Sequence, residues 1–185
     1  EALYVKVGGK TVADLVVMPV DELIAFFAGL ELDGHDTKTA ARILVEIRNR
    51  LQYLMDVGLG YLTLDRLSST LSGGESQRVK LASFLSKEST EGNVMFIFDE
   101  PTTGLHFHDI NKLLDAFNAL IARGHTIVIV EHNMDVIKCA DWVVDLGPEA
   151  GDRGGSIVFE GTPDGLAGCK ESYTGRYLAL REKNE

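Results

Sequence analysis

The strongest constraint on the fold is an alternation of strand-like and helix-like segments that begins near residue 93. Residues 94–98 form an unbroken apolar run, which is typical of a strand covered on both faces. Residues 109–123 carry apolar side chains at helical spacing and stop before Gly124, a favoured residue just after a helix. Residues 126–130 form a second apolar run. This alternation predicts an α/β fold with a mostly parallel sheet flanked by helices.

The same alternation continues toward the end of the sequence. A short helix is expected over residues 133–140, followed by strands over residues 142–146 and 156–160. Pro163 predicts the start of a last helix, because proline is favoured at the first helical position. Trp142 begins one of these strands, and we expect it in the core.

The first half of the sequence has a different pattern, mainly helical. A short strand over residues 3–7 is expected to lead into a turn at Gly8 and Gly9. Two stretches with apolar residues at helical spacing follow, within residues 23–30 and residues 43–55. They predict two helices that each bury one stripe.

We therefore divide the 185 residues into a helical subdomain, residues 1–92, and an α/β core portion, residues 93–185. No apolar run approaches the ~20 residues that cross a bilayer, so no membrane association is expected. The two cysteines, Cys139 and Cys169, form no CxxC pair, which favours a reducing, cytoplasmic setting.

The formal net charge of −10 disfavours tight DNA binding by this segment alone, because Lys and Arg contacts to phosphates supply most non-specific affinity. Two groups of basic residues could still form local patches: Arg42, Arg48 and Arg50, and Arg78, Lys80 and Lys87. For both groups we favour solvated helix faces. Arg50 can pair with Glu46 four residues earlier.

The sharpest local motif is LSGGESQR, which begins at Leu71. Ser72 and Glu75 form a capping box for the helix that follows. Gly73 and Gly74 leave backbone N–H groups open at the helix start, where partial positive charge suits a phosphate. Taken alone, this segment is better explained as an ordinary capped helix, because capping boxes are common.

Two further segments favour the functional interpretation. The apolar run at residues 94–98 leads directly into Asp99 and Glu100, at the sheet edge where α/β folds bind ligands. Asp99 could hold Mg²⁺ through water, and Glu100 could orient or deprotonate an attacking water. The second apolar run is followed by His132, which could donate to a γ-phosphate at the same edge. An acidic turn and a structural histidine would not explain all three segments in this order.

The order of these three motifs resembles that of an ABC-type nucleotide-binding domain. Their amino-acid sequences are similar to those of the UvrA family of DNA-repair excinuclease subunits. The stretches that carry the resemblance are TLSGGESQRVKLASFLSK, FIFDEPTTGLHFHDINKLLDAF, IVIVEHNMDVIKCADWVVDLGPEAGDRGG and IVFEGTP. With EIRNRLQYLMDVGLGYLTLDR before them, they cover essentially the whole chain. His106 stands where transporter domains usually carry an aspartate.

The resemblance implies composite ATP sites, each held between the phosphate loop of one domain and the signature helix of a second nucleotide-binding domain. Ser72, Gly73 and Gly74, with Glu75 beside them, would contact the γ-phosphate. Asp99 would be the Mg²⁺ carboxylate, Glu100 the general base and His132 the switch histidine. Gly104 and His106 would belong to the loop that crosses the domain interface.

The chain contains no G-x-x-x-x-G-K-[ST], and Gly8-Gly9-Lys10-Thr11 imitates only its end. We therefore expect the chain to be inactive alone and to be the C-terminal portion of a larger ATP hydrolase. ATP and Mg²⁺ would bind in the complete protein, zinc only in a region upstream. Damaged DNA would bind other regions, and a UvrB-like subunit would be a partner.

Three other functions remain open at this point. The chain could be a non-enzymatic dimerisation or docking module. It could be half of an SMC-like ATPase, although that class needs long heptads before the signature segment, and this sequence has none. A drug-resistance paralogue with UvrA-like motifs is the third.

Overall fold

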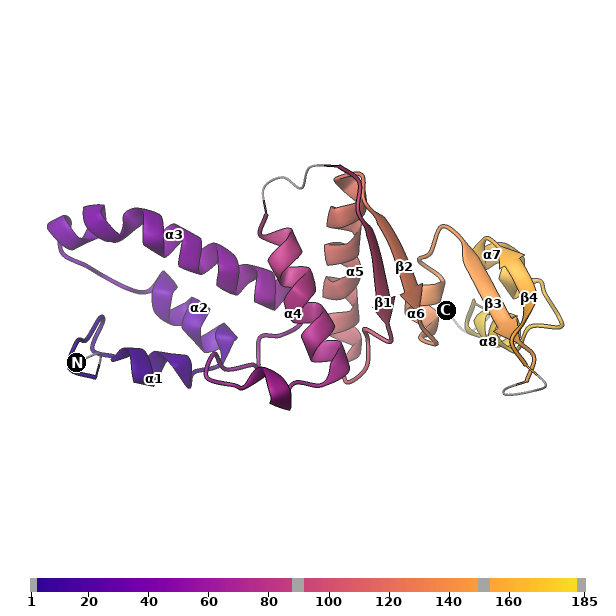
Figure 1. Cartoon of the computed structure of the whole chain (residues 1–185), viewed down its shortest axis with the longest axis horizontal. Helices are drawn as coiled ribbons and strands as arrows, with labels where there is room; N and C mark the ends of the chain where they lie inside the picture. The colour runs from indigo at the N-terminus through magenta and orange to yellow at the C-terminus, as the bar shows by residue number, and fades with distance from the viewer. Residues whose placement is uncertain (1–2, 88–91, 150–153, 183–185) are drawn as a thin grey trace. The chain divides into compact units, whose positions relative to one another are not determined.

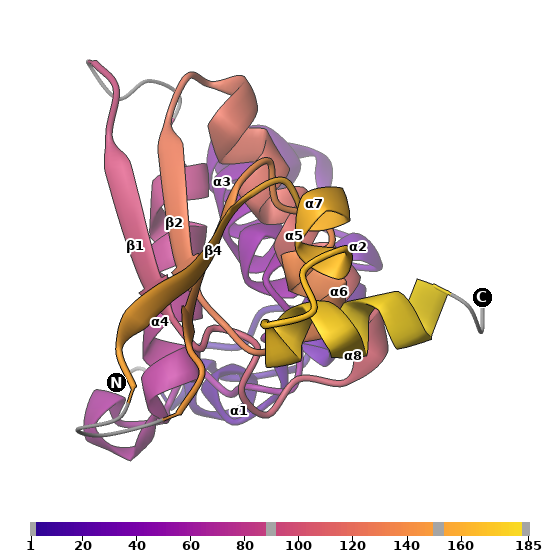
Figure 2. The ribbon, with the colours of Figure 1, turned by 90° about the vertical axis from the view of Figure 1, so that its right-hand side faces the viewer.

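The computed structural model describes residues 3–87, 92–149 and 154–182, which form two compact units, residues 1–129 and residues 130–185. Each unit has its own buried apolar core. Helices and short strands occur in both (Figures 1 and 2), so the α/β class is confirmed. The predicted division after residue 92 rests on the change in secondary-structure pattern and stays a prediction. Among the described residues, no helix combines the length and apolar character that crossing a membrane requires.

The first unit begins with three helices, α1 (Val12–Val16), α2 (Val20–Ala28) and α3 (Gly34–Asp56). Val20 and Leu23 of α2 pack with Leu51 of α3 in a small buried cluster. The N-terminal half of α3 buries less than its apolar stripe predicted, since Ile43 is 62% exposed.

The expected strand over residues 3–7 does not form. Only Val7 and Lys10 pair, in an antiparallel bridge around Gly8 and Gly9. These two glycines have φ of +55° and +79°, which glycine adopts without a steric penalty, so the predicted turn is confirmed. The strand fails because its side chains are all exposed, and no apolar burial offsets the entropy of ordering it.

The main core of the first unit lies between two helices and one face of a two-stranded sheet. The elements are α4 (Gly73–Leu85), β1 (Met95–Asp99), α5 (Phe107–Ala122) and β2 (Thr126–Val130). β1 and β2 are hydrogen-bonded neighbours that run side by side in the same direction, joined through α5 (Figures 1 and 2). Phe96 and Phe98 point into this core, where Phe98 meets Phe117 of α5 at 4.9 Å between ring centroids.

The other face of this sheet is exposed, contrary to the prediction of strands covered on both sides. Met95 and Ile97 of β1 are 63% and 69% exposed, and Val128 of β2 is 43% exposed. Alternate residues of a strand face opposite sides, and the described chain supplies a layer on one side only.

The second unit contains α6 (Met134–Ile137), β3 (Val143–Gly147), β4 (Ser156–Gly161), α7 (Pro163–Ala167) and α8 (Tyr173–Glu182). Ile137, Leu166 and Leu178 form its core. Both predicted strands are present, but they pair antiparallel, with Val143 opposite Gly161. A short connection permits this return, whereas a parallel pair needs a crossover of a dozen or more residues. The sequence analysis predicted no helix after the one that begins at Pro163, so it missed α8.

Two side chains, one just before β3 and one within it, are placed by tertiary contacts. Trp142 precedes the strand and is 62% exposed, so its predicted place in the core is wrong. Asp145 faces the helices, where the hydroxyl groups of Ser172 and Thr174 donate to its two oxygens at 2.5 and 3.0 Å. This carboxylate therefore ties β3 to the start of α8. The connection between β3 and β4 includes residues 150–153, which lie outside the described residues.

Candidate nucleotide-contact site

The start of α4 is the first part of the candidate site. The Ser72 hydroxyl accepts a hydrogen bond from the N–H of Glu75 at 3.2 Å, and the Glu75 carboxylate accepts one from the N–H of Ser72 at 2.7 Å. The predicted capping box is thus confirmed. Gly73 is exposed, and a side chain there would meet no atom within 4 Å. The N–H groups of Gly73 and Gly74 lie in the first turn, where they have no partner within the helix. Gly74 is buried, so the exposed Gly73 is the glycine open to an anion.

Glu75 is buried beneath this turn and is fully engaged with protein groups. The Tyr61 hydroxyl donates to its Oε1 at 2.7 Å, and Arg66 Nη1 lies 3.5 Å from the same oxygen. The hydrogen bond from the Ser72 backbone holds the pKa of Glu75 below its usual value. Burial, followed by the bond to Glu75, raises the pKa of Tyr61. Glu75 therefore stabilises the turn, and its predicted contact with a nucleotide stays a prediction.

The acids form the second part of the site. Asp99 ends β1 and Glu100 follows it, and both side chains are exposed. Glu100 has φ of +46°, a left-handed conformation that costs a non-glycine residue ~1–3 kcal/mol and is commonest at functional sites. Its carbonyl accepts the N–H of Thr103 at 3.1 Å, which closes the turn after the strand.

The loop after the acids leads into α5. Gly104 has φ of +77° and is exposed, as is His106, the residue before the helix. The carbonyl of His106 accepts the N–H groups of Asp109 and Ile110 at 2.9 and 3.2 Å. Both predicted interface residues thus lie on the surface of the first unit.

Two residues that the sequence interpretation missed bring the turn and the acids together. The Gln77 side-chain amide donates to the carbonyl of Asp99 at 2.8 Å and accepts the Asp99 N–H at 3.1 Å. Arg78 Nη1 donates to the carbonyls of Pro101 and Thr103 at 2.7 and 3.4 Å. The signature helix is therefore bonded directly to the acid-bearing loop of the same chain.

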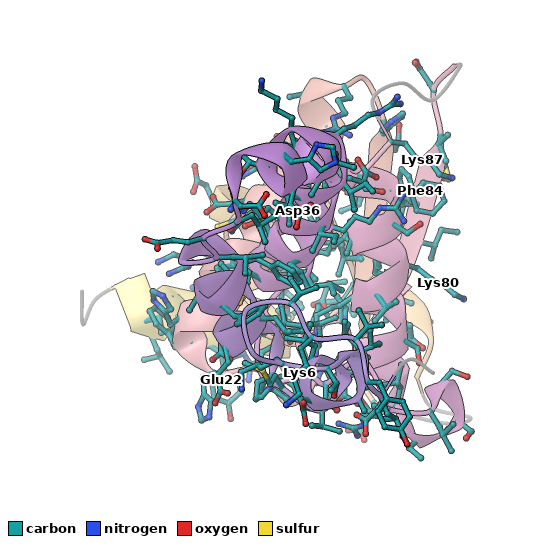
Figure 3. All side chains as sticks on the ribbon, turned by 90° about the vertical axis from the view of Figure 1, so that its left-hand side faces the viewer. Lys6, Glu22, Asp36, Lys80, Phe84 and Lys87 are labelled. Carbon is teal, nitrogen blue, oxygen red and sulfur yellow. The ribbon has the colours of Figure 1, made fainter. Side chains whose placement is uncertain are left out.

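Arg78 is 1% exposed, so its predicted place on a solvated basic face is wrong. A signal was present in the sequence, because Arg78, Leu81, Ala82 and Leu85 share one helical face and are all buried. Lys80 of α4 and Lys87, two residues after the end of α4, point outward on the same side as Phe84 (Figure 3). Lys87 Nζ lies 4.8 Å from the centroid of the Phe84 ring.

The other basic group follows the prediction of a solvated face at Arg50, which pairs with Glu46 at 2.7 Å.

His132 lies in the second unit, between β2 and the Asn133 cap of α6. Its side chain is exposed, and its N–H donates to the Glu131 carboxylate at 3.0 Å. Its predicted meeting with Asp99 and Glu100 stays a prediction.

The carboxylates of Asp99 and Glu100 fit a Mg²⁺ ion whose other ligands are water and nucleotide phosphates. The described residues contain no group of three or more His, Cys, Asp or Glu side chains arranged to hold a metal ion. One exposed carboxylate, as at Asp99, suits Mg²⁺, which keeps several waters and binds nucleotide phosphates.

Comparison with known proteins identifies the family. No protein-family model matches the chain. It is 52% identical over 178 residues to UvrABC system protein A from Clostridium perfringens (strain 13 / Type A), which covers 96% of this chain and 17% of that protein. It is 49% identical over 185 residues to UvrABC system protein A from Aquifex aeolicus (strain VF5), over 100% of this chain and 18% of that protein. The chain belongs to the UvrA family.

The fold agrees with this UvrA assignment. The crystal structure of UvrA2 from Deinococcus radiodurans matches with a TM-score of 0.82 and 41% sequence identity, covering 96% of this chain and 23% of that one. The chain therefore spans less than a fifth of the UvrABC system protein A relatives named above.

Proposed function

We propose that this UvrA-family chain contributes a signature helix, a Mg²⁺ carboxylate and a general base to the ATP sites of a nucleotide-excision-repair ATPase. The observation that carries the proposal is the direct bonding of the first turns of α4 to the Asp99 loop, with Gly73, Asp99 and Glu100 exposed. The identity of 52% and 49% to two UvrABC system A proteins, over 96% and 100% of this chain, favours this function over an SMC-like half or a docking module.

Each exposed group has a defined task in this proposal. Bound ATP and Mg²⁺ supply the phosphoryl group to be transferred and its charge neutralisation. The N–H groups at Gly73 and Gly74 donate to the γ-phosphate of a nucleotide held by a second nucleotide-binding domain. Asp99 accepts hydrogen bonds from water around Mg²⁺, and Glu100 accepts a proton from the attacking water.

The remaining assignments complete this proposal. His132 donates to the γ-phosphate, and Gly104 and His106 contact the opposing domain. The phosphate loop and zinc sites belong to other parts of the cytoplasmic protein. Damaged DNA and a UvrB-like subunit bind there as well. A C-terminal position within the parent protein, and the separation of residues 1–92 as its helical signature subdomain, belong to the same proposal.

The test uses the complete protein that contains this chain. Glu100→Gln keeps the size of the side chain but cannot accept the proton, so ATP turnover should fall ~10²–10⁴-fold while nucleotide binding persists. Glu22→Gln, an exposed change on α2, is the matched control and should leave turnover unchanged. Turnover of Glu100→Gln at the control rate would remove Glu100 from the role of base.

A second measurement concerns the chain alone. Residues 1–185 contain no phosphate loop, so they should bind no ATP at millimolar concentration and hydrolyse none. Saturable binding with hydrolysis by the isolated chain would contradict a composite site.

A further inference from the structure

We propose that Tyr61 and Arg66 strengthen the preference of this site for a nucleoside triphosphate over a diphosphate, by fixing the glycine turn that meets the γ-phosphate. The inference rests on the proposed function, in which the turn at Gly73 donates to that phosphate. Tyr61 and Arg66 act through the Glu75 carboxylate, so they are positioning residues.

The carboxylate of Glu75 is bonded on both of its oxygens. Oε2 accepts the Ser72 N–H at 2.7 Å, which is the ordinary capping-box bond. Oε1 accepts the Tyr61 hydroxyl at 2.7 Å, and Arg66 Nη1 lies 3.5 Å from the same atom. Arg66 is held in turn by the Thr70 carbonyl, which accepts its Nη2 at 3.0 Å. A capping box needs only the bond to Ser72, so Tyr61 and Arg66 add a restraint from outside the helix.

Burial makes this restraint strong. Glu75 is only 6% exposed, and a buried carboxylate is costly unless hydrogen bonds satisfy it. The Ser72 backbone, and after it Tyr61 and Arg66, lower the pKa of Glu75, so the side chain is ionised at neutral pH. Moving the carboxylate away from its donors would leave a buried charge without partners, which opposes any shift of Glu75.

The turn needs such a restraint because it contains two adjacent glycines. Gly73 and Gly74 lose more conformational freedom on ordering than other residue types do. Glu75 spans this pair, since its backbone follows Gly74 and its carboxylate returns to the Ser72 N–H. Fixing the carboxylate therefore fixes the peptide groups between. A donor that is already aimed at a phosphate costs no ordering when the phosphate binds.

The loop that carries Tyr61 is itself anchored on both sides. The Gly60 carbonyl accepts the N–H of Asp21 at 3.0 Å, and the Leu62 carbonyl accepts that of Val20 at 2.9 Å. These bonds join the residues that flank Tyr61 to the start of α2. The Tyr61 hydroxyl is thus presented to the carboxylate from a backbone that is held in place.

The test is Tyr61→Phe in the complete protein, with dissociation constants measured in Mg²⁺ for ADP and for the β,γ-imido analogue of ATP. The change removes only the hydroxyl that donates to Glu75. We expect the analogue to bind ~5-fold more weakly, which corresponds to the net worth of one hydrogen bond. ADP lacks the γ-phosphate that the turn contacts, so its dissociation constant should stay within twofold of wild type.

Two further variants sharpen this test. Tyr173→Phe, on α8 of the second unit, is the matched control, because Tyr173 is 51% exposed and Tyr61 52%. It should leave both dissociation constants unchanged. At Arg66, Lys keeps a charged donor and should retain most of the preference for the analogue, whereas Met should lose part of it. An Arg66→Met protein with wild-type preference would remove Arg66 from the proposal.

Equal weakening of ADP and the analogue in Tyr61→Phe would assign the hydroxyl a structural role and overturn the inference. Wild-type constants for both nucleotides would overturn it as well. These outcomes are distinct from failure of the proposed function. Normal turnover by Glu100→Gln removes that function, whereas an inactive Glu100→Gln protein beside a Tyr61→Phe protein with unchanged preference removes only the positioning role.

Discussion

Each unit of the molecule contains a carboxylate held by hydroxyl groups, and the two differ in what lies beside them. Glu75 accepts the Tyr61 hydroxyl and the Ser72 N–H beneath an exposed glycine turn. Asp145 accepts the hydroxyls of Ser172 and Thr174, and so joins β3 to α8. Both are structural devices. Only Glu75 lies beside a candidate functional site, because the exposed Gly73 turn and the acids Asp99 and Glu100 are close to it. A carboxylate with several hydrogen bonds is therefore not by itself evidence of a functional site.

Among the changes that distinguish the two units, Gly175→Ala is expected to have the largest effect on the free energy of unfolding. A side chain at Gly175 would lie 2.1 Å from the carbonyl oxygen of Leu166, and backbone atoms cannot retreat easily. We expect the second unit to lose ~3 kcal/mol of unfolding free energy or more. Urea unfolding followed by the fluorescence of Trp142, the single tryptophan, reports on that unit.

The control for this change is Gly73→Ala, where a side chain would meet nothing within 4 Å. It should alter the unfolding free energy by no more than ~0.5 kcal/mol. Equal destabilisation by the two alanines would mean that Leu166 and Gly175 are not packed as described.

A middle-sized effect is expected from Asp145→Ala. The change removes the acceptor of two hydroxyl groups, one of them on the buried residue Ser172, and should cost ~2 kcal/mol. Asp135→Ala breaks a pair with the half-exposed Arg181 and should cost under ~1 kcal/mol. Trp142 fluorescence measures both, and a larger loss from Asp135→Ala would contradict the structural role of Asp145.

A smaller effect than that of Asp145→Ala, about 1 kcal/mol, is expected from Glu75→Gln and should depend on pH. The folded pKa of Glu75 lies below its ordinary value of 4.5, so its ionised form stabilises the fold above pH 4.5. That contribution is lost as the pH falls through the lowered pKa. Glutamine keeps the capping-box geometry without the charge.

Urea unfolding followed by circular dichroism, at pH 7 and in steps below pH 4.5, measures the difference between wild type and Glu75→Gln. The difference should shrink as the pH falls. A difference that stays constant would assign the effect to shape and not to charge.

Local signals in the sequence predicted local structure well. The capping box at Ser72, the Asn133 cap and the turn at Gly8 all appear, because each depends on a few neighbouring residues. Of the site, the sequence placed Asp99 and Glu100 correctly at the end of a strand, although Asp99 is still part of β1. These features need no knowledge of what packs against them.

Features set by distant contacts were not predictable in the same way. The sequence indicates only that Asp145 needs a partner, and that partner lies 27 residues away in chain order at Ser172. Trp142 and Arg78 were assigned by residue type, whereas tertiary packing decided their exposure. The antiparallel pairing of β3 with β4 likewise depends on how the connection returns.

The open side of the β1–β2 sheet has a practical consequence for handling this polypeptide. Met95, Ile97 and Val128 present adjoining apolar atoms to solvent, and such surfaces promote self-association. Preparations of residues 1–185 alone should therefore cloud or oligomerise as concentration rises. Replacing Ile97 with lysine should raise solubility without disturbing the opposite side, where Phe96 and Phe98 are packed.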